Sequence, residues 1–184
     1  MLFAPVNGGL EVRGEPDGGA TIAGRFPFGA EAELQRGRFE TFQPGAFEYE
    51  DVHLLASHDF AKPLASRGAG SLSVNDTDDA LQFEARISPE VANTSHGRDT
   101  LALARAGLSV GLSPGFAVAP DGETVSRRDN GVLRTVRSAK LHELSVVTRP
   151  AYDAAQVEAR SWDPAVDLDA FINHPMVLPA FRWR

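Results

Sequence analysis

The sequence predicts an α+β domain with few helices, built on an antiparallel barrel or sandwich. Several short segments have the alternating or buried pattern of strands, whereas only one segment has a well-supported helical spacing. The chain also carries 17 glycines and 12 prolines among its 184 residues, which indicates many turns. Its length fits one domain followed by a tail, and we place the domain at residues 1–160 and the tail at residues 161–184.

The clearest strands are predicted in the middle of the chain. Residues 52–56 (VHLLA) form a short apolar run that leads toward His58, and they predict a buried strand. Residues 70–74 and 81–87 predict an antiparallel pair joined by a turn at 75–79. Apolar and polar side chains alternate cleanly along the second strand of this pair, so one of its faces should be buried.

Residues 98–106 predict a helix, because leucine and alanine recur there at roughly helical spacing. Ser88 or Thr94 could cap the start of this helix, and Gly107 is well placed to end it.

The second half of the chain predicts further short elements. Residues 108–118 and 141–148 read as strands, and a polar hairpin-like excursion lies between them. Residues 151–160 predict a short helix.

Composition narrows the classes of function. The formal net charge is −7, and the densest basic cluster is the pair Arg127 and Arg128, so no nucleic-acid partner is expected. The absence of cysteine removes disulfides and thiol catalysis. We found neither a secretory leader nor a long apolar run, so we expect a cytoplasmic protein without a membrane partner.

The five histidines do not stand at metal-ligand spacing, and no Gly-rich phosphate loop is followed by Lys and Ser or Thr. We therefore expect no metal and no cofactor. Serine chemistry remains, in which a hydroxyl is activated by a histidine that a third group orients. Residue types and spacing alone leave many Ser–His pairings open.

Four stretches, in this order and spacing, resemble the prohead (head maturation) protease family of tailed phages, which is distantly similar to herpesvirus assemblin. They are residues 43–47 (QPGAF), 54–64 (LLASHDFAKPL), 105–116 (RAGLSVGLSPGF) and 141–151 (LHELSVVTRPA). The resemblance implies an α+β fold, mostly an antiparallel β-barrel flanked by helices and herpesvirus-protease-like. It also makes residues 1–160 the prohead protease domain.

The resemblance implies a Ser-His-Glu triad. Ser113 matches the nucleophile, His58 the general base and Glu143 the third position. Two alternatives stay open: Ser109 stands in a similar G-L-S-x-G frame, and His142 could replace Glu143, since the herpesvirus relatives use a histidine there.

Other readings of the motif residues also remain. His58 could be a loop histidine bonded to Asp59, and Arg149 could support an oxyanion or form a surface ion pair.

The sequence departs from the family pattern in two places. Pro114 follows the serine where an apolar residue is usual, which removes a backbone N–H that could have served an oxyanion hole. Residues 20–42 also match the family poorly, because they lack its usual D-x-x-G-D run.

The resemblance implies a serine endopeptidase that acts inside the assembling prohead, in the cytoplasm of a bacterial host. Its substrates would be scaffold and extensions of the major capsid protein, with self-cleavage implied and self-association left open. The alternative is an inactive, protease-derived assembly or scaffolding protein. The tail at 161–184, rich in proline and aromatic residues, would serve recruitment or strap the domain.

Overall fold

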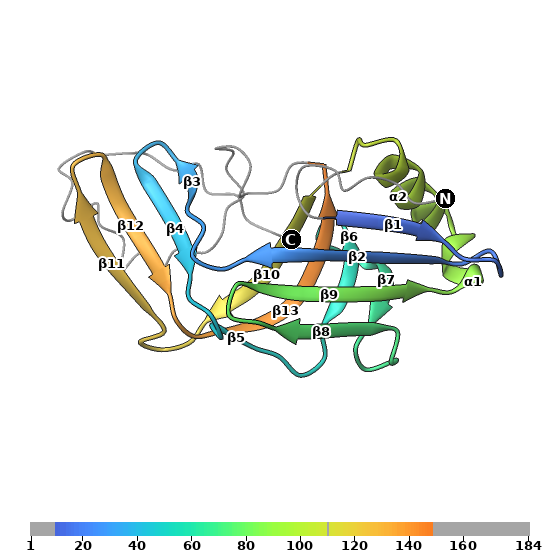
Figure 1. The fold of residues 1–184 in the computed structure, drawn as a ribbon, viewed down its shortest axis with the longest axis horizontal. Coiled ribbons are helices and arrows are strands. Elements are labelled where there is room, and N and C mark those ends of the chain that lie inside the picture. The colour runs from blue at the N-terminus through green and yellow to red at the C-terminus, as the bar shows by residue number, and fades with distance from the viewer. Residues whose placement is uncertain (1–9, 110, 149–184) are drawn as a thin grey trace.

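The computed structural model describes residues 10–109 and 111–148, which form three sheets and two helices (Figure 1). The first sheet has the order β1-β2-β9-β8, the second β10-β13-β6-β7 with β5 paired to β13, and the third β11-β12-β4-β3. Figure 1 shows the third sheet at one end of the molecule and the helices at the other.

The bounds of the strands follow this grouping. The first sheet consists of β1 (Leu10–Gly14), β2 (Ala20–Pro27), β8 (Leu72–Asp76) and β9 (Ala80–Ile87). The second consists of β5 (Phe47–Glu48), β6 (His53–Ala56), β7 (Asp59–Ser66), β10 (Gly111–Val118) and β13 (Ala139–Val147). The third consists of β3 (Ala32–Gln35), β4 (Arg38–Phe42), β11 (Glu123–Arg128) and β12 (Gly131–Val136).

The two helices use both of the predicted caps. The Ser88 side chain accepts from the Val91 N–H and starts α1 (Pro89–Ala92), and the Thr94 side chain accepts from the Gly97 N–H and starts α2 (Ser95–Arg105). Gly107 follows α2 with φ of 70°, a left-handed conformation that ends a helix at little cost. The predicted helix is therefore confirmed, with its start moved forward to Ser95.

The predicted strands are also found. Strands β8 and β9 pair antiparallel, and the side chains of β9 alternate between buried and exposed from Leu81 to Ile87. The polar excursion forms the antiparallel hairpin of β11 and β12. The predicted helix at 151–160 and the tail at 161–184 lie outside the described residues.

Strands dominate and helices are few, as predicted, but the expectation of a barrel is wrong for the described residues. A barrel requires each strand to pair on both edges. Instead, β1 and β8 are the outer strands of the first sheet and β10 and β7 those of the second, and no described strand pairs beyond them. Most strand pairs are antiparallel, although β13 pairs with β5 and β6, and β12 with β4, in parallel.

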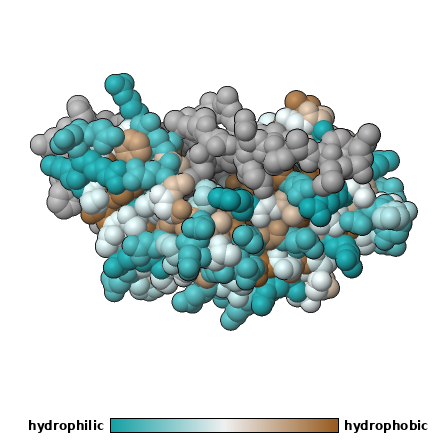
Figure 2. Space-filling model, viewed as in Figure 1, coloured by the Kyte–Doolittle hydropathy of each residue, from teal (hydrophilic) through white to brown (hydrophobic). Residues whose placement is uncertain are grey.

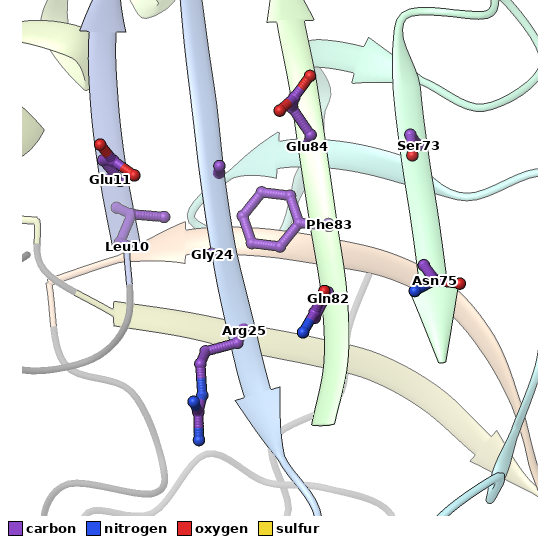
Figure 3. Close-up of a pocket in the computed structure, with 10 residues that line it drawn as sticks. Leu10, Glu11, Gly24, Arg25, Ser73, Asn75, Gln82, Phe83 and Glu84 are labelled. Atoms are coloured by element: carbon purple, nitrogen blue, oxygen red, sulfur yellow. The ribbon is translucent and has the colours of Figure 1, made fainter. Parts of the chain in front are cut away.

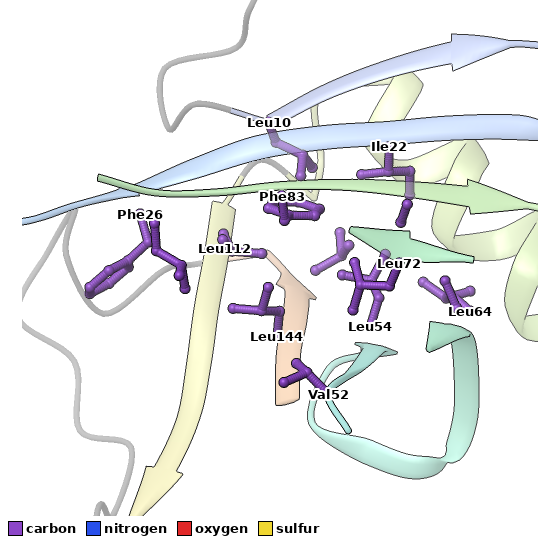
Figure 4. Close-up of a cluster of buried hydrophobic side chains, with 14 of the residues drawn as sticks. Leu10, Ile22, Phe26, Val52, Leu54, Leu64, Leu72, Phe83, Leu112 and Leu144 are labelled. Atoms are coloured by element: carbon purple, nitrogen blue, oxygen red, sulfur yellow. The ribbon is translucent and has the colours of Figure 1, made fainter. Parts of the chain in front are cut away.

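The main core lies between the first and second sheets. Figure 4 shows Ile22 and Phe83 of the first sheet facing Leu54, Leu112 and Leu144 of the second. All five side chains are buried. Burial of this apolar surface supplies the driving force for packing the two sheets together.

Four phenylalanines join the three sheets to one another. The ring of Phe42 in β4 lies 5.3 Å from Phe26 in β2, 5.0 Å from Phe47 in β5 and 5.0 Å from Phe116 in β10, measured between centroids. Phe26 and Phe116 meet the Phe42 ring edge to face and Phe47 stacks on it, and such aromatic pairs add to the free energy of burial. The third sheet is therefore packed against the other two through Phe42.

On the face seen in Figure 2, hydrophilic residues cover most of the described area and hydrophobic ones form only small patches. Within the described chain, neither helix is long and apolar enough to cross a membrane.

Candidate active site

The pairing of β10 with β13 brings the predicted nucleophile and the predicted carboxylate onto one face of the second sheet. Ser113 lies opposite Ser145, and Gly115 lies opposite Glu143. Because side chains alternate along a strand, these four residues share the face that points away from Leu112 and the main core. Ser113 and Glu143 are both buried, with 1% and 4% of their surface exposed.

His142 is the extra residue of an irregularity in this pairing. Phe116 pairs with Leu141, so His142 is skipped between the two strands. Because His142 is skipped, Leu141 faces the core and is buried, whereas His142 is exposed. Leu141 therefore does not share a face with Glu143, contrary to what simple alternation along the strand predicts.

His58 reaches the same face from a tight turn between β6 and β7. Ser57 and His58 have φ of 55° and 61°, so both adopt the left-handed backbone conformation that residues other than glycine rarely adopt. The Ser57 N–H donates to the Val146 carbonyl at 3.1 Å, and the His58 N–H donates to Ser145 Oγ at 2.9 Å. Two neighbouring residues of β13 thus fix the turn.

The His58 ring contacts Glu143 directly. His58 Nδ1 lies 2.6 Å from Glu143 Oε1, and the Ser145 hydroxyl donates to Glu143 Oε2 at 2.6 Å. The buried carboxylate is therefore satisfied at both oxygens, which removes the cost of burying it alone. The His58 side chain is 28% exposed, so one part of the ring remains accessible.

Asp59 does not take the place of Glu143 beside His58. Its carboxylate accepts from the Ala61 N–H at 2.9 Å and lies 3.0 Å from the Lys62 ammonium. The Ala61 N–H first, and then Lys62, lower the pKa of the Asp59 carboxyl below its usual value. The reading of His58 as a histidine bonded to Asp59 is therefore wrong: the carboxylate in contact with its ring is Glu143.

The remaining candidates lie elsewhere. Ser109 is buried in the turn after α2, where its N–H donates to the Leu103 carbonyl, and it precedes β10. Pro114 lies in β10, an outer strand of the described sheet, where a missing N–H is tolerated. Arg149 lies outside the described residues.

Residues 10–109 and 111–148 contain no group of three His, Asp or Glu side chains that could hold a metal ion. A hollow of about 430 Å³ lies on the outer face of the first sheet, where Glu11, Arg25 and Glu84 line it (Figure 3). His58, Ser113 and Glu143 are not among the residues that line this hollow.

Gly115 is required by the position of the Glu143 carboxylate. A Cβ atom at residue 115 would lie 2.7 Å from Glu143 Cδ and 2.8 Å from Glu143 Cγ, closer than real Cβ contacts. The side chain of Glu143 thus occupies the space above the glycine opposite it. The second glycine of the G-L-S-P-G-F segment therefore makes room for the carboxylate.

Sequence reasoning did not assign a role to Gly115 or to Ser145. The signal for Ser145 was present, because residues 143 and 145 are two apart on a predicted strand and so share a face. A role for Gly115 depends on the register between β10 and β13, which local sequence patterns do not predict.

Substituting Gly115 with alanine should displace the Glu143 carboxylate and lower the free energy of unfolding by about 1–3 kcal/mol, the usual cost of overpacking. Gly14→Ala is the matched control, since its Cβ would meet only the Arg105 side chain at 3.8 Å. Urea unfolding of both variants measures the difference. Equal midpoints for Gly115→Ala and Gly14→Ala would contradict the proposed contact.

Comparison with known protein families gives an independent result. Residues 10–167 match the family described as caudovirus prohead serine protease. No curated protein and no solved structure matched the chain. The family match covers most of the chain and includes the β6–β7 turn that carries His58 and the strands β10 and β13 that carry Ser113 and Glu143. The chain therefore belongs to the caudovirus prohead serine protease family.

Proposed function

We propose that the chain is a serine endopeptidase of phage head maturation with Ser113 as nucleophile, His58 as general base and Glu143 as the carboxylate that orients the base. The observation that carries the proposal is the 2.6 Å contact between His58 Nδ1 and Glu143 Oε1, on the sheet face that also holds Ser113. Family membership supports the serine protease class.

The contact suits the chemistry that the reaction needs. With the Glu143 carboxylate ionised, His58 Nδ1 carries a hydrogen that it donates to Oε1, and Nε2 is the basic nitrogen. Ser113 Oγ forms a bond to the scissile carbonyl carbon while Nε2 takes its proton. That proton passes to the leaving amine as the C–N bond breaks, and water then hydrolyses the acyl-enzyme by the same route.

The oxyanion that forms during attack needs donors other than the residue after the nucleophile. Pro114 occupies that position and has no N–H. The hole must therefore be built from other backbone or side-chain donors, as it is in enzymes where side chains supply one of the hydrogen bonds.

The proposed substrates are the scaffold and the extensions of the major capsid protein, cleaved inside the assembling prohead, with self-cleavage as a further reaction. These assignments rest on the family. The likeness to herpesvirus assemblin remains a prediction, as does a domain boundary near residue 160.

A second candidate function is that of an inactive, protease-derived assembly or scaffolding protein. Two observations favour it: Ser113 is 1% exposed, and Pro114 follows it. The two functions differ in one measurable property, because an assembly protein does not need the Ser113 hydroxyl.

Ser113→Ala should abolish processing of the co-expressed major capsid protein, since loss of a triad nucleophile costs about 10⁶-fold in kcat. Ser109→Ala is the matched control, because both serines are buried but only Ser113 lies on β10 opposite Ser145. The mass of the capsid protein reports cleavage. Equal loss in the two variants would refute the assignment of Ser113, and no cleavage by the unaltered chain would favour the assembly function.

Glu143→Gln should keep the fold but slow proteolysis by up to about 10⁴-fold, the cost of a similar carboxylate-to-amide change in a triad. The new amide NH₂ would donate to His58 Nδ1, so the single hydrogen of the neutral ring would lie on Nε2. Nε2 could then not accept the proton of Ser113, as the general base must. His142→Ala is the control, because His142 is exposed in the skipped position. Full activity in Glu143→Gln together with an inactive His142→Ala would give the third role to His142.

A further inference from the structure

The Ser145 hydroxyl lies where the three elements of the site meet. Ser145 is 0% exposed and is the residue of β13 directly opposite Ser113 in β10. Its Oγ atom contacts both the backbone of the turn that carries His58 and the carboxylate of Glu143.

The direction of both hydrogen bonds is fixed by chemistry. A backbone N–H can only donate, so Ser145 Oγ accepts from His58 N at 2.9 Å. The single hydroxyl hydrogen is then free to point at Glu143 Oε2, 2.6 Å away, and an ionised carboxylate can only accept it. The two bonds therefore do not compete, and each polarises the other in the same sense.

The two bonds act on opposite sides of the His58–Glu143 contact. One holds the His58 backbone in its left-handed conformation, which sets the direction in which the ring leaves the chain. The other holds Oε2 of Glu143, which directs Oε1 of the same carboxylate toward His58 Nδ1. Without the hydroxyl, both the histidine and the carboxylate would lose one of the contacts that orient them.

We propose that Ser145 is a positioning residue of the peptidase, whose hydroxyl joins the His58 turn to the Glu143 carboxylate and so sets the geometry of the base. This inference rests on the proposed function of the site. Ser145 does not need to touch substrate, and its effect passes through His58 and Glu143.

The test compares Ser145→Ala with the pair Ser145→Thr and Ser145→Val in the full-length chain. Threonine and valine have nearly the same shape, so a difference between them reports the hydroxyl even if the added methyl group disturbs packing. Cleavage of purified major capsid protein gives kcat and KM, and hydrogen exchange by NMR gives the protection of the His58 amide. Ser57 is an internal control, because its amide donates to a backbone carbonyl.

We expect Ser145→Ala and Ser145→Val to lose about 10²-fold in kcat, as small misplacements of catalytic groups do. KM should stay within about threefold, because substrate contacts are unchanged. The His58 amide should exchange at least about tenfold faster, as loss of a hydrogen bond allows. Ser145→Thr should resemble the unaltered chain in both readouts, and the Ser57 amide should change little in all three variants.

Unchanged kcat in a folded Ser145→Ala variant would overturn the proposal, as would equal kcat for the threonine and valine variants. A loss of kcat without faster exchange at His58 would also overturn it. Failure of the proposed function is separate: it would appear as undiminished cleavage by Ser113→Ala. The exchange measurement tests the link between Ser145 and the turn whatever that result is.

Discussion

The antiparallel register of β10 and β13 is the constraint on which the rest of the site depends. It places Ser113 opposite Ser145 and Gly115 opposite Glu143, so one face of the second sheet holds both the serine and the carboxylate. The other face of the same strands packs into the main core, which fixes the register, because a slip of one residue would exchange the two faces. Core packing and site geometry are therefore set by the same pairing.

The His58 turn adds a second constraint. Two successive residues in the left-handed conformation cost roughly 1–2 kcal/mol each, so the turn persists because its surroundings hold it. Backbone and side-chain acceptors of β13 supply that support at Ser57 and His58. Such strain is often found where a side chain must be aimed, and here it aims the imidazole at Glu143.

Local sequence patterns predicted the strands and the main helix well, because periodicity and capping are local properties. The alternation of residues 81–87 and the Thr94 cap are examples, and both appear in β9 and α2. Closure of the sheets was mispredicted, since it depends on which distant strands pair. The skip at His142 was also not predictable, because it arises from the pairing with β10. The site residues came from the family motif, and the geometry added Ser145 to them.

The central claim is that Ser113 and His58 work as one catalytic unit, and a double-mutant cycle tests it most directly. The rate of capsid-protein cleavage would be measured for Ser113→Ala, His58→Ala and the double variant. Members of a triad are strongly non-additive. The double variant should be no slower than either single variant. Losses that multiply would show that His58 acts independently of Ser113 and would contradict its role as the general base of Ser113.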